Sequence, residues 1–294
     1  MILSIVTPII FATCIYNLVT TIDMYIFYAA MGTGVNATTL YGVYSGEYIV
    51  LQNVPVALAA AMSTASIPAI SSSWSLRDYR QTKEHIRSGI RITMLILIPS
   101  AVGMSVLAYP IIGMIFPQKE TIITSTMLLA VGSPGVVFFG LSTLTNGILQ
   151  AIGEVKAPLK NSAIALVWHC IITFALLFFT PLGLYSLVIG NCIYGLQVCY
   201  LNQKSLRKKT HYKQEIRRTY VLPLLAAILM GIVVGACYFG LFILTRKVFI
   251  PLIISVIIGV IVYFTVILYL YADHPQELSA IPYVNRLVYK FKKR

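Results

Sequence analysis

Two carboxylates lie within or beside apolar stretches of this sequence, where an ionised side chain needs a partner. Asp23 stands inside IYNLVTTIDMYIFYAA, with apolar or aromatic residues on both sides. An ionised carboxylate in lipid is costly unless it faces water, meets a partner or takes up a proton. That chemistry is typical of an ion or substrate pathway. The alternative is an acid that reaches water near the outer surface. Glu47 opens the next apolar stretch, where a helix macrodipole favours a carboxylate, so a structural role suits it better.

Neutral polar side chains recur inside the same apolar stretches. Each one alone is more often a hydrogen bond between helices than a ligand. Asn146 and Gln150 are four residues apart and therefore share one helix face. Together the polar residues indicate a hydrated interior and are candidates for an ion-coupling or cavity site: Asn17, Asn53, Asn146, Gln150, His169 and Asn191.

Motifs for catalysis or for a resident cofactor are not found in the sequence. It has no GxSxG, Walker loop, HExxH or pair of carboxylates on one helix. The five cysteines lie in apolar runs without a CxxC pair, which argues against a disulfide framework or a zinc site. We therefore expect no enzyme activity, no catalytic residue and no cofactor.

The composition decides which elements position these side chains. Of the 294 residues 58% are hydrophobic and 11% are charged, whereas soluble domains carry about 25% charged residues. The apolar stretches run for about 20 residues, the length of a spanning helix, without the alternation of a membrane barrel. The sequence predicts an all-α, polytopic membrane protein with about eight spans, near residues 1–30, 48–70, 92–116, 122–150, 162–179, 184–201, 220–244 and 249–271.

The basic residues set the expected orientation. All but three of the 22 lysines and arginines fall between alternate spans or in the C-terminal tail, the exceptions being Lys119, Arg246 and Lys247. The side richer in lysine and arginine is normally cytoplasmic. We therefore expect both termini in the cytoplasm, a location in the cytoplasmic membrane and membrane lipids as partners. No arginine is expected inside a span. The charge of +13 sits in loops and not in a stripe with aromatic residues, so no nucleic-acid partner is expected.

Prolines are frequent within the expected spans. A proline in a helix interior frees a backbone carbonyl, and transporters use such breaks at cavities and gates. The alternative is a simple packing kink. Pro8, Pro55 and Pro68 are the hinge candidates.

Three ordered stretches carry a resemblance to a known family. They are LQNVPVALAAAMSTASIPAISSSWSLRDYRQTKEHIRSGIRITMLILIPSAVGMSVLAYPIIGMIF, LTNGILQAIGEVKAPLKNSAI and ELSAIPYVNRLVYKFKKR. The sequence resembles stage V sporulation protein B-like polysaccharide biosynthesis proteins. These belong to the superfamily of multidrug, oligosaccharidyl-lipid and polysaccharide (MOP) exporters, which includes MATE transporters and MurJ-type lipid II flippases.

The resemblance implies two six-helix lobes and an additional helix pair, of which this chain matches the second lobe and the pair. The expected organisation is a transporter lobe over 1–203, a basic cytoplasmic linker over 204–219, two further helices over 220–272 and a basic cytoplasmic tail over 273–294. The implied partner is a missing N-terminal lobe or a second copy of the chain.

The resemblance also implies an ion site at Asp23, which is similar in position to an acidic residue used for sodium in some members. Its partners would come from the fifth and sixth spans, where Asn161, His169 and Asn191 are present but no second acid. Sodium or a proton is the expected coupling ion.

Three functions follow. The first is a flippase, or half of one, that moves a lipid-linked oligosaccharide or polysaccharide precursor by alternating access. The second is a multidrug or organic-cation exporter of the same superfamily, since an acidic cavity without arginine suits a cation. The third is a non-transporting scaffold or remnant, because one lobe cannot rock against itself.

Overall fold

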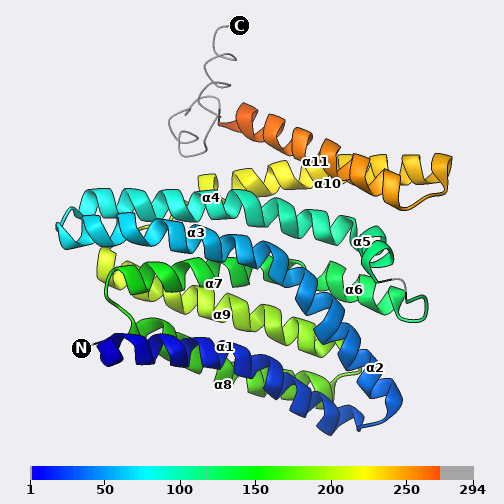
Figure 1. Cartoon of the computed structure of the whole chain (residues 1–294), viewed down its shortest axis with the longest axis horizontal. Helices are drawn as coiled ribbons and strands as arrows, with labels where there is room; N and C mark the ends of the chain where they lie inside the picture. Colours follow the sequence, from blue (N-terminus) through cyan, green and yellow to red (C-terminus); the bar gives the residue numbers. More distant parts are fainter. Residues whose placement is uncertain (1, 117, 272–294) are drawn as a thin grey trace, which may run out of the picture.

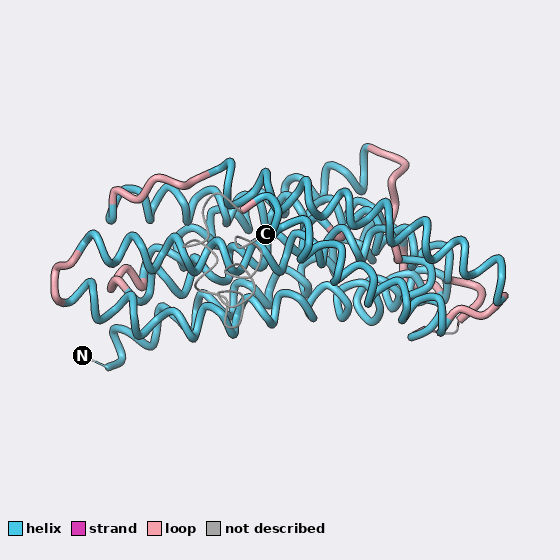
Figure 2. Tube along the Cα trace, turned by 90° about the horizontal axis from the view of Figure 1, so that it is seen from above, coloured by secondary structure: helices cyan, strands magenta, loops and turns pink. Residues whose placement is uncertain are grey.

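The chain folds into a bundle of helices that run along the long axis of the molecule, with loops at both ends (Figure 1, Figure 2). The structure, a computed structural model, describes residues 2–116 and 118–271. Within these ranges every regular element is a helix and no strand occurs. The expectation of an all-α membrane protein is confirmed.

The helices follow the order of the expected spans. They are α1 (Ile2–Met31), α2 (Val35–Val43), the π-helix η1 (Tyr44–Tyr48), α3 (Ile49–Ser75), α4 (Tyr79–Val106), α5 (Ala108–Ile115), α6 (Ile122–Gly132), α7 (Pro134–Ala151), α8 (Lys156–Phe179), α9 (Tyr185–Thr210), the π-helix η2 (Arg217–Val221), α10 (Leu222–Thr245) and α11 (Phe249–Leu270).

By length and composition, six helical segments of the described chain can each cross a membrane, and the bent pair α6–α7 would be a seventh. The more polar α9 is not among them. The total of eight spans therefore stays a prediction. The domain boundaries also stay predictions, but α9 continues to Thr210, so the boundary expected at residue 203 lies inside a helix. The expected tail over 273–294 lies outside the described residues.

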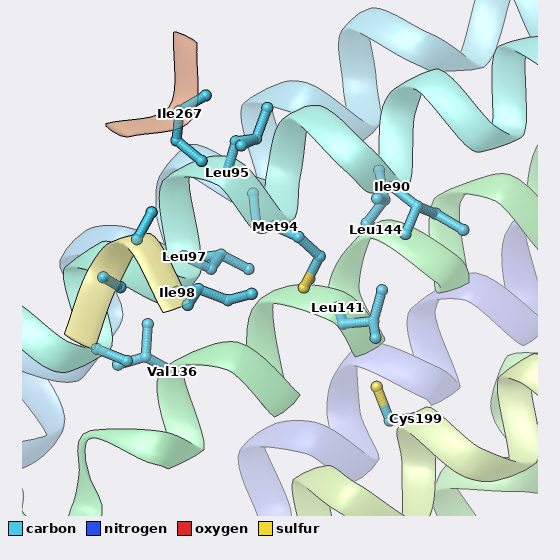
Figure 3. Close-up of a cluster of buried hydrophobic side chains, with 14 of the residues drawn as sticks. Ile90, Met94, Leu95, Leu97, Ile98, Val136, Leu141, Leu144, Cys199 and Ile267 are labelled. Atoms are coloured by element: carbon cyan, nitrogen blue, oxygen red, sulfur yellow. The ribbon is translucent and has the colours of Figure 1, made fainter. Parts of the chain in front are cut away.

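The core surrounds α4, which packs against α3 and α7 of the lobe and against α10 of the final helix pair. Neighbouring helices pack in the order α1, α8, α9, α7, α3 and α4, and α10 joins α4 to α11. Figure 3 shows side chains of α4, including Met94 and Leu97, facing Val136 and Leu141 of α7. Burial of this apolar face fixes the lobe as one unit.

Glycines allow the closest approaches between helices. A Cβ built on Gly140 of α7 would lie 2.2 Å from Cδ1 of Leu97, and one on Gly147 would lie 1.9 Å from Oγ of Ser63 on α3. Small side chains let helices pack tightly in lipid, where no hydrophobic force drives them together. The contacts of α3 and α4 with α7 depend on these two glycines.

Two helix breaks lie beside each other. The axis turns by 50° between α6 and α7, at Ser133 and Pro134. Side chains compensate the break, because the hydroxyls of Ser105 and Ser133 donate to the Ala130 carbonyl, each at 3.1 Å. The Tyr48 hydroxyl, from the π-helix η1, donates to the Gly132 carbonyl at 3.4 Å. Freed carbonyls inside a membrane protein need such partners.

The basic segment that the sequence places between the second and third spans is part of a long helix. Asp78 caps α4, accepting a hydrogen bond from the Gln81 backbone at 2.9 Å, and the helix continues without a break to Val106. Arg91, which the sequence placed in a loop, is buried within α4, so the expectation of no arginine inside a helical span is wrong. Its Nη2 lies 2.7 Å from Glu215, which also pairs with Arg87 at 3.3 Å. This ion cluster fixes the linker to the lobe.

The final helix pair is attached through a proline. Pro99 lacks an N–H, so the Leu95 carbonyl four residues earlier has no partner within α4. The Tyr263 hydroxyl of α11 donates to this carbonyl at 3.0 Å. The bond anchors α11 to the lobe at a buried position. The three hinge candidates also lie within helices, Pro8 in α1 and both Pro55 and Pro68 in α3, and their role stays a prediction.

We predict that Tyr263→Phe lowers the free energy of unfolding by about 1–3 kcal/mol, the usual cost of a buried carbonyl without a donor. Thermal unfolding in mild detergent measures the loss. Tyr269→Phe is the matched control, because Tyr269 on the same helix is 82% exposed. Equal stability of the two variants would contradict the anchoring role of Tyr263.

Candidate functional site

Asp23 lies at the centre of a buried hydrogen-bond network that joins four elements. Its Oδ1 is 2.8 Å from His169 Nε2 on α8. Its Oδ2 accepts hydrogen bonds from the Tyr44 hydroxyl of η1 at 3.0 Å and from Asn191 Nδ2 of α9 at 2.8 Å. Asn191 Nδ2 also contacts the Tyr44 hydroxyl. Asp23 and His169 are both fully buried. Neither carboxylate oxygen lacks a partner, which is how a carboxylate is tolerated at this depth.

Residues of α8 and α9 fix the position of His169 in the network. His169 Nδ1 lies 3.1 Å from the Gly190 carbonyl and 3.4 Å from the Thr173 hydroxyl. Tyr194 of α9 meets the imidazole edge to face, with ring centroids 5.6 Å apart. Because α8 packs against both α1 and α9, the ring of His169 has a fixed place between Asp23 and the α9 backbone.

A polar cavity of about 500 Å³ lies between α1, α3, α7, α8 and α9. Three of the sequence candidates line it, namely Asn53, Asn146 and Gln150. Ser63, Thr64 and Thr143 add hydroxyls, and no charged side chain is among the lining residues. The lining can therefore form many neutral hydrogen bonds but no ion pair.

A smaller cavity of about 90 Å³ lies between the polar cavity and the Asp23 network, with residues of both in its lining. It shares Asn53 and Tyr194 with the polar cavity, and Asn191 with the network. Asn17, Thr20 and Gln52 complete its polar lining. A polar space of this size holds a few water molecules, since each takes roughly 30 Å³. Asn17 thus shares a cavity with Asn191, which donates a hydrogen bond to Asp23.

An apolar groove of about 580 Å³ lies on the opposite side of α3. Leu51, Val54 and Pro55 of α3 line the groove, whereas Asn53, Val56 and Ala57 line the polar cavity. Segments of α4, α5, α10 and α11 form its remaining walls. Helix α3 therefore separates an apolar compartment from a polar one.

Two sequence candidates lie away from the Asp23 network. Asn161 donates from Nδ2 to Asn202 Oδ1 at 2.9 Å, and Asn202 in turn donates to Asn146 Oδ1 at 2.7 Å, so this cluster ties α7, α8 and α9 together. Glu47 is buried in η1, in the middle of a continuous helical segment and not in a first turn. The macrodipole explanation for Glu47 is therefore wrong, and Glu47 lines none of the three cavities described above.

A sodium ion at Asp23 fits this donor set poorly. Hard cations take oxygen ligands, whereas His169 and Asn191 approach the carboxylate with nitrogen. Among the described residues no three His, Cys, Asp or Glu side chains cluster as a metal site would require. Sodium coupling stays a prediction.

Sequence reasoning missed Tyr44 and Asn202. Tyr44, which donates to Asp23, is the first residue of a π-helix, and such single-turn bulges are frequent at functional sites. No local pattern in VYSGEYIV predicts a π-helix. Asn202, in contrast, lies eleven residues after Asn191 on the same helix, a spacing close to three turns that could have directed attention to it.

The spanning helices, the polar cavity and the carboxylate network define a helical lobe of a multi-pass membrane protein. A family model described as lipid II flippase MurJ matches residues 2–259, and the chain belongs to this family. The MOP superfamily is confirmed, while the stage V sporulation protein B-like branch stays a prediction.

The chain is similar to curated proteins and to solved structures. It is 26% identical over 196 residues to the lipid II flippase MurJ of Bacillus subtilis, covering 62% of this chain and 33% of the relative. It is 28% identical over 176 residues to the probable multidrug resistance protein NorM of Synechocystis sp., covering 57% and 36%. An outward-facing multidrug resistance MATE family transporter of the MOP superfamily shares the fold, with a TM-score of 0.56, 12% identity and coverage of 97% and 67%. The chain spans about a third of the length of the curated relatives it matches.

We predict that Gly190→Ala weakens the Asp23 network. A Cβ at this position would lie 2.3 Å from Oγ1 of Thr173 and 3.4 Å from Cε1 of His169, so either the Thr173 side chain or α9 must shift. We expect the free energy of unfolding to fall by about 1–3 kcal/mol, as for other overpacked cores. The control is Gly240→Ala on α10, where a Cβ meets nothing within 4 Å and where alanine should raise stability by up to about 1 kcal/mol. Equal shifts in the detergent unfolding midpoint would contradict close packing at Gly190.

Proposed function

We propose that this chain is one lobe of an exporter that moves a lipid-linked oligosaccharide or polysaccharide precursor across the cytoplasmic membrane by alternating access. The observation that carries the proposal is the pairing of an uncharged polar cavity with an apolar groove on the two sides of α3. A substrate with a sugar part and a hydrocarbon part needs both compartments. Membership of the lipid II flippase MurJ family supports the same substrate class.

The polar cavity suits sugar hydroxyls. Its amide and hydroxyl side chains offer both donors and acceptors, and a charged group would gain no ion pair there. Asp23 lies behind the smaller cavity with both oxygens engaged, and Arg91 is held by Glu215 at the cytoplasmic end of α4. The anionic part of a lipid-linked precursor therefore needs cationic groups from elsewhere in the transporter.

The apolar groove suits a hydrocarbon chain. Hydrophobic residues of α3, α4, α5, α10 and α11 line it almost throughout, with Ser100 and Tyr263 as the exceptions that carry a hydroxyl. Binding of the hydrocarbon chain does not by itself favour transport in one direction. In our proposal the chain lies in the groove and the sugar lies in the polar cavity, on the two sides of α3. Pro55, one of the hinge candidates, lines this groove from α3.

Alternating access requires a second lobe, because the transport site of such proteins lies between two halves that rock against each other. In our proposal the second lobe comes from a further segment of a longer polypeptide, from another chain or from a second copy of this one. The positive charges at the Trp74–Arg91 end of the bundle and on the linker support a cytoplasmic location for that end and for both termini.

Two other functions compete with this proposal. The similarity to NorM supports a multidrug exporter, but an organic cation would gain little from a cavity without a carboxylate. A non-transporting scaffold would need neither compartment. None of the three functions changes the covalent bonds of a molecule, so we do not propose an enzyme.

Transport assays on proteoliposomes that hold the chain together with its second lobe test the proposal. We expect a fluorescent polyprenyl-linked oligosaccharide to cross the bilayer and a cationic dye to stay where it is. Asn53→Leu, which fills the polar cavity, should reduce the flipping rate at least about tenfold by removing one hydrogen bond to a bound sugar and adding a clash.

The matched control is Ile257→Leu, a conservative change at an exposed position of α11 outside both compartments. Its flipping rate should equal that of the wild type. Export of the dye without movement of the lipid-linked sugar would support the multidrug function instead. If neither molecule moved, the result would support the non-transporting scaffold.

Asp23 is the proposed ion-coupling residue. We predict that Asp23→Asn, with the same shape but no charge, abolishes transport driven by an ion gradient while the protein still inserts in the membrane. Gradient-driven transport is measured in the same vesicles, and insertion by protease accessibility of the loops. Transport at the wild-type rate in this variant would rule out coupling through Asp23.

A further inference from the structure

We infer that Asn202 is a positioning residue, which orients the amide of Asn146 so that its N–H bonds are offered to the polar cavity. The cavity then takes a substrate that presents an oxygen acceptor at this place. The inference rests on the proposed function for the nature of the substrate, because the polar cavity is the compartment assigned to the sugar. The orientation of Asn146 itself follows from hydrogen-bond geometry.

Asn202 is fully buried on α9, which packs against both α7 and α8. The nitrogen of a side-chain amide carries two N–H donors, and its oxygen carries two acceptor lone pairs. At a buried position these groups need partners from the protein, since lipid supplies none. The neighbours of Asn202 therefore decide which end of the amide faces each helix.

The end of Asn202 that faces α7 is the nitrogen. Nδ2 lies 3.5 Å from the Ser142 carbonyl and 3.2 Å from the Thr145 hydroxyl oxygen. A backbone carbonyl only accepts hydrogen bonds. The Thr145 hydroxyl donates its own hydrogen to the Leu141 carbonyl at 2.8 Å, so its oxygen is left as an acceptor. An amide turned over would place its oxygen against these two acceptors.

The end of Asn202 that faces α8 is the oxygen. Asn161 Nδ2 donates to Asn202 Oδ1 at 2.9 Å and to the Ser205 hydroxyl at 3.1 Å. Helix α8 thus supplies the donor that the oxygen needs, and α7 supplies the acceptors that the nitrogen needs. Because the two neighbouring helices require the same orientation, the amide of Asn202 has one arrangement.

This arrangement determines which end of Asn146 faces the cavity. Asn202 Nδ2 donates to Asn146 Oδ1 at 2.7 Å, so the oxygen of Asn146 is the end that is held against α9. Asn146 is also a lining residue of the polar cavity. Its Nδ2 has no hydrogen-bond partner among the described residues, yet it is not sealed inside the protein. The two N–H donors of Asn146 are therefore available to a molecule in the cavity.

Gln150 provides the contrast within the same cavity. It lies four residues after Asn146 on α7 and lines the same space, but the part of the chain that the structure describes gives its amide no hydrogen bond. Gln150 can therefore offer either its nitrogen or its oxygen, whereas Asn146 offers nitrogen alone. Fixed donors are complementary to a hydroxyl, ring or carbonyl oxygen of a sugar and not to an ammonium group.

Hydrogen exchange of the side-chain amides tests the orientation without any ligand. NMR of the full chain in detergent with ¹⁵N-labelled asparagine gives the signals, and Asn146→Ala and Asn202→Leu assign them. We expect the Asn202 amide hydrogens to exchange at least about 100-fold more slowly than those of Asn146, because only the latter meet cavity water. Equal rates, or a slower Asn146 amide, would overturn the inference, because Nδ2 of Asn146 would then lie against the protein.

Binding of a lipid-linked sugar tests the consequence for recognition. The probe is a fluorescent polyprenyl diphosphate-linked disaccharide, compared with the same polyprenyl diphosphate without sugar. Asn202→Leu, which has a side chain of similar size but can neither donate nor accept, should weaken binding of the disaccharide probe about tenfold, the effect of one hydrogen bond. Binding of the sugar-free lipid should not change. The matched control is Tyr200→Leu on the same helix, where Tyr200 is 66% exposed and outside the cavity.

A double-mutant cycle separates positioning from simple packing. If Asn202 acts through Asn146, Asn202→Leu has no further effect on binding in a protein that already carries Asn146→Ala. An equal loss in both backgrounds would show that Asn202 only holds the helices together, and the inference would fall. If Asn202→Leu does not fold, exchange of the wild-type Asn146 amide, assigned with Asn146→Ala, still decides the orientation.

The two arms also separate this inference from the proposed function. Wild-type protein that binds the sugar-free lipid as tightly as the disaccharide probe would reject the proposed substrate, and amide exchange would then decide the inference by itself. Sugar-dependent binding together with a protected Asn146 amide would keep the proposed function and reject the role of Asn202.

Discussion

The structure depends on one constraint, which is that lipid offers no hydrogen bonds, so every polar group at depth must find its partner inside the protein. The fully buried Asp23 carboxylate is the strictest case, with His169, Tyr44 and Asn191 converging on it from three elements. The same constraint places Tyr263 on the carbonyl that Pro99 frees and Glu215 on the buried Arg91. The helices are arranged around these satisfied groups as much as around the apolar core of α4 and α7.

This arrangement gives the lobe two compartments and one buried carboxylate network. Helix α3 carries apolar residues toward the groove and amide and hydroxyl residues toward the cavity, because neighbouring positions of a helix face different sides. The Asp23 network lies behind the polar cavity and contacts the π-helix that leads into α3. A change in the network can therefore reach the wall between the two compartments without crossing the core.

Much of the fold could be predicted, because continuous apolar stretches and the distribution of lysine and arginine are strong signals. Asp23 could be recognised as unusual from its apolar neighbours, and His169 and Asn191 from their depth in the expected spans. Their mutual contact could not be derived, because it depends on how α1, α8 and α9 pack. Tyr44 escaped notice because a tyrosine in an apolar stretch is ordinary, and Arg91 because the boundary of α4 lies twelve residues before it. Glu47 was misjudged because η1 continues from α2 without a helix terminus.

The central claim is that this lobe works against a second one. The most direct measurement is the mass of the complex in native membranes, extracted in mild detergent, with every polypeptide identified. The account predicts a second helical lobe in fixed ratio, on a longer polypeptide that includes this sequence, on a separate chain, or as a second copy. A monomer of this sequence alone, with no other lobe, would contradict alternating access and would leave the cavity without the opposite wall that transport requires.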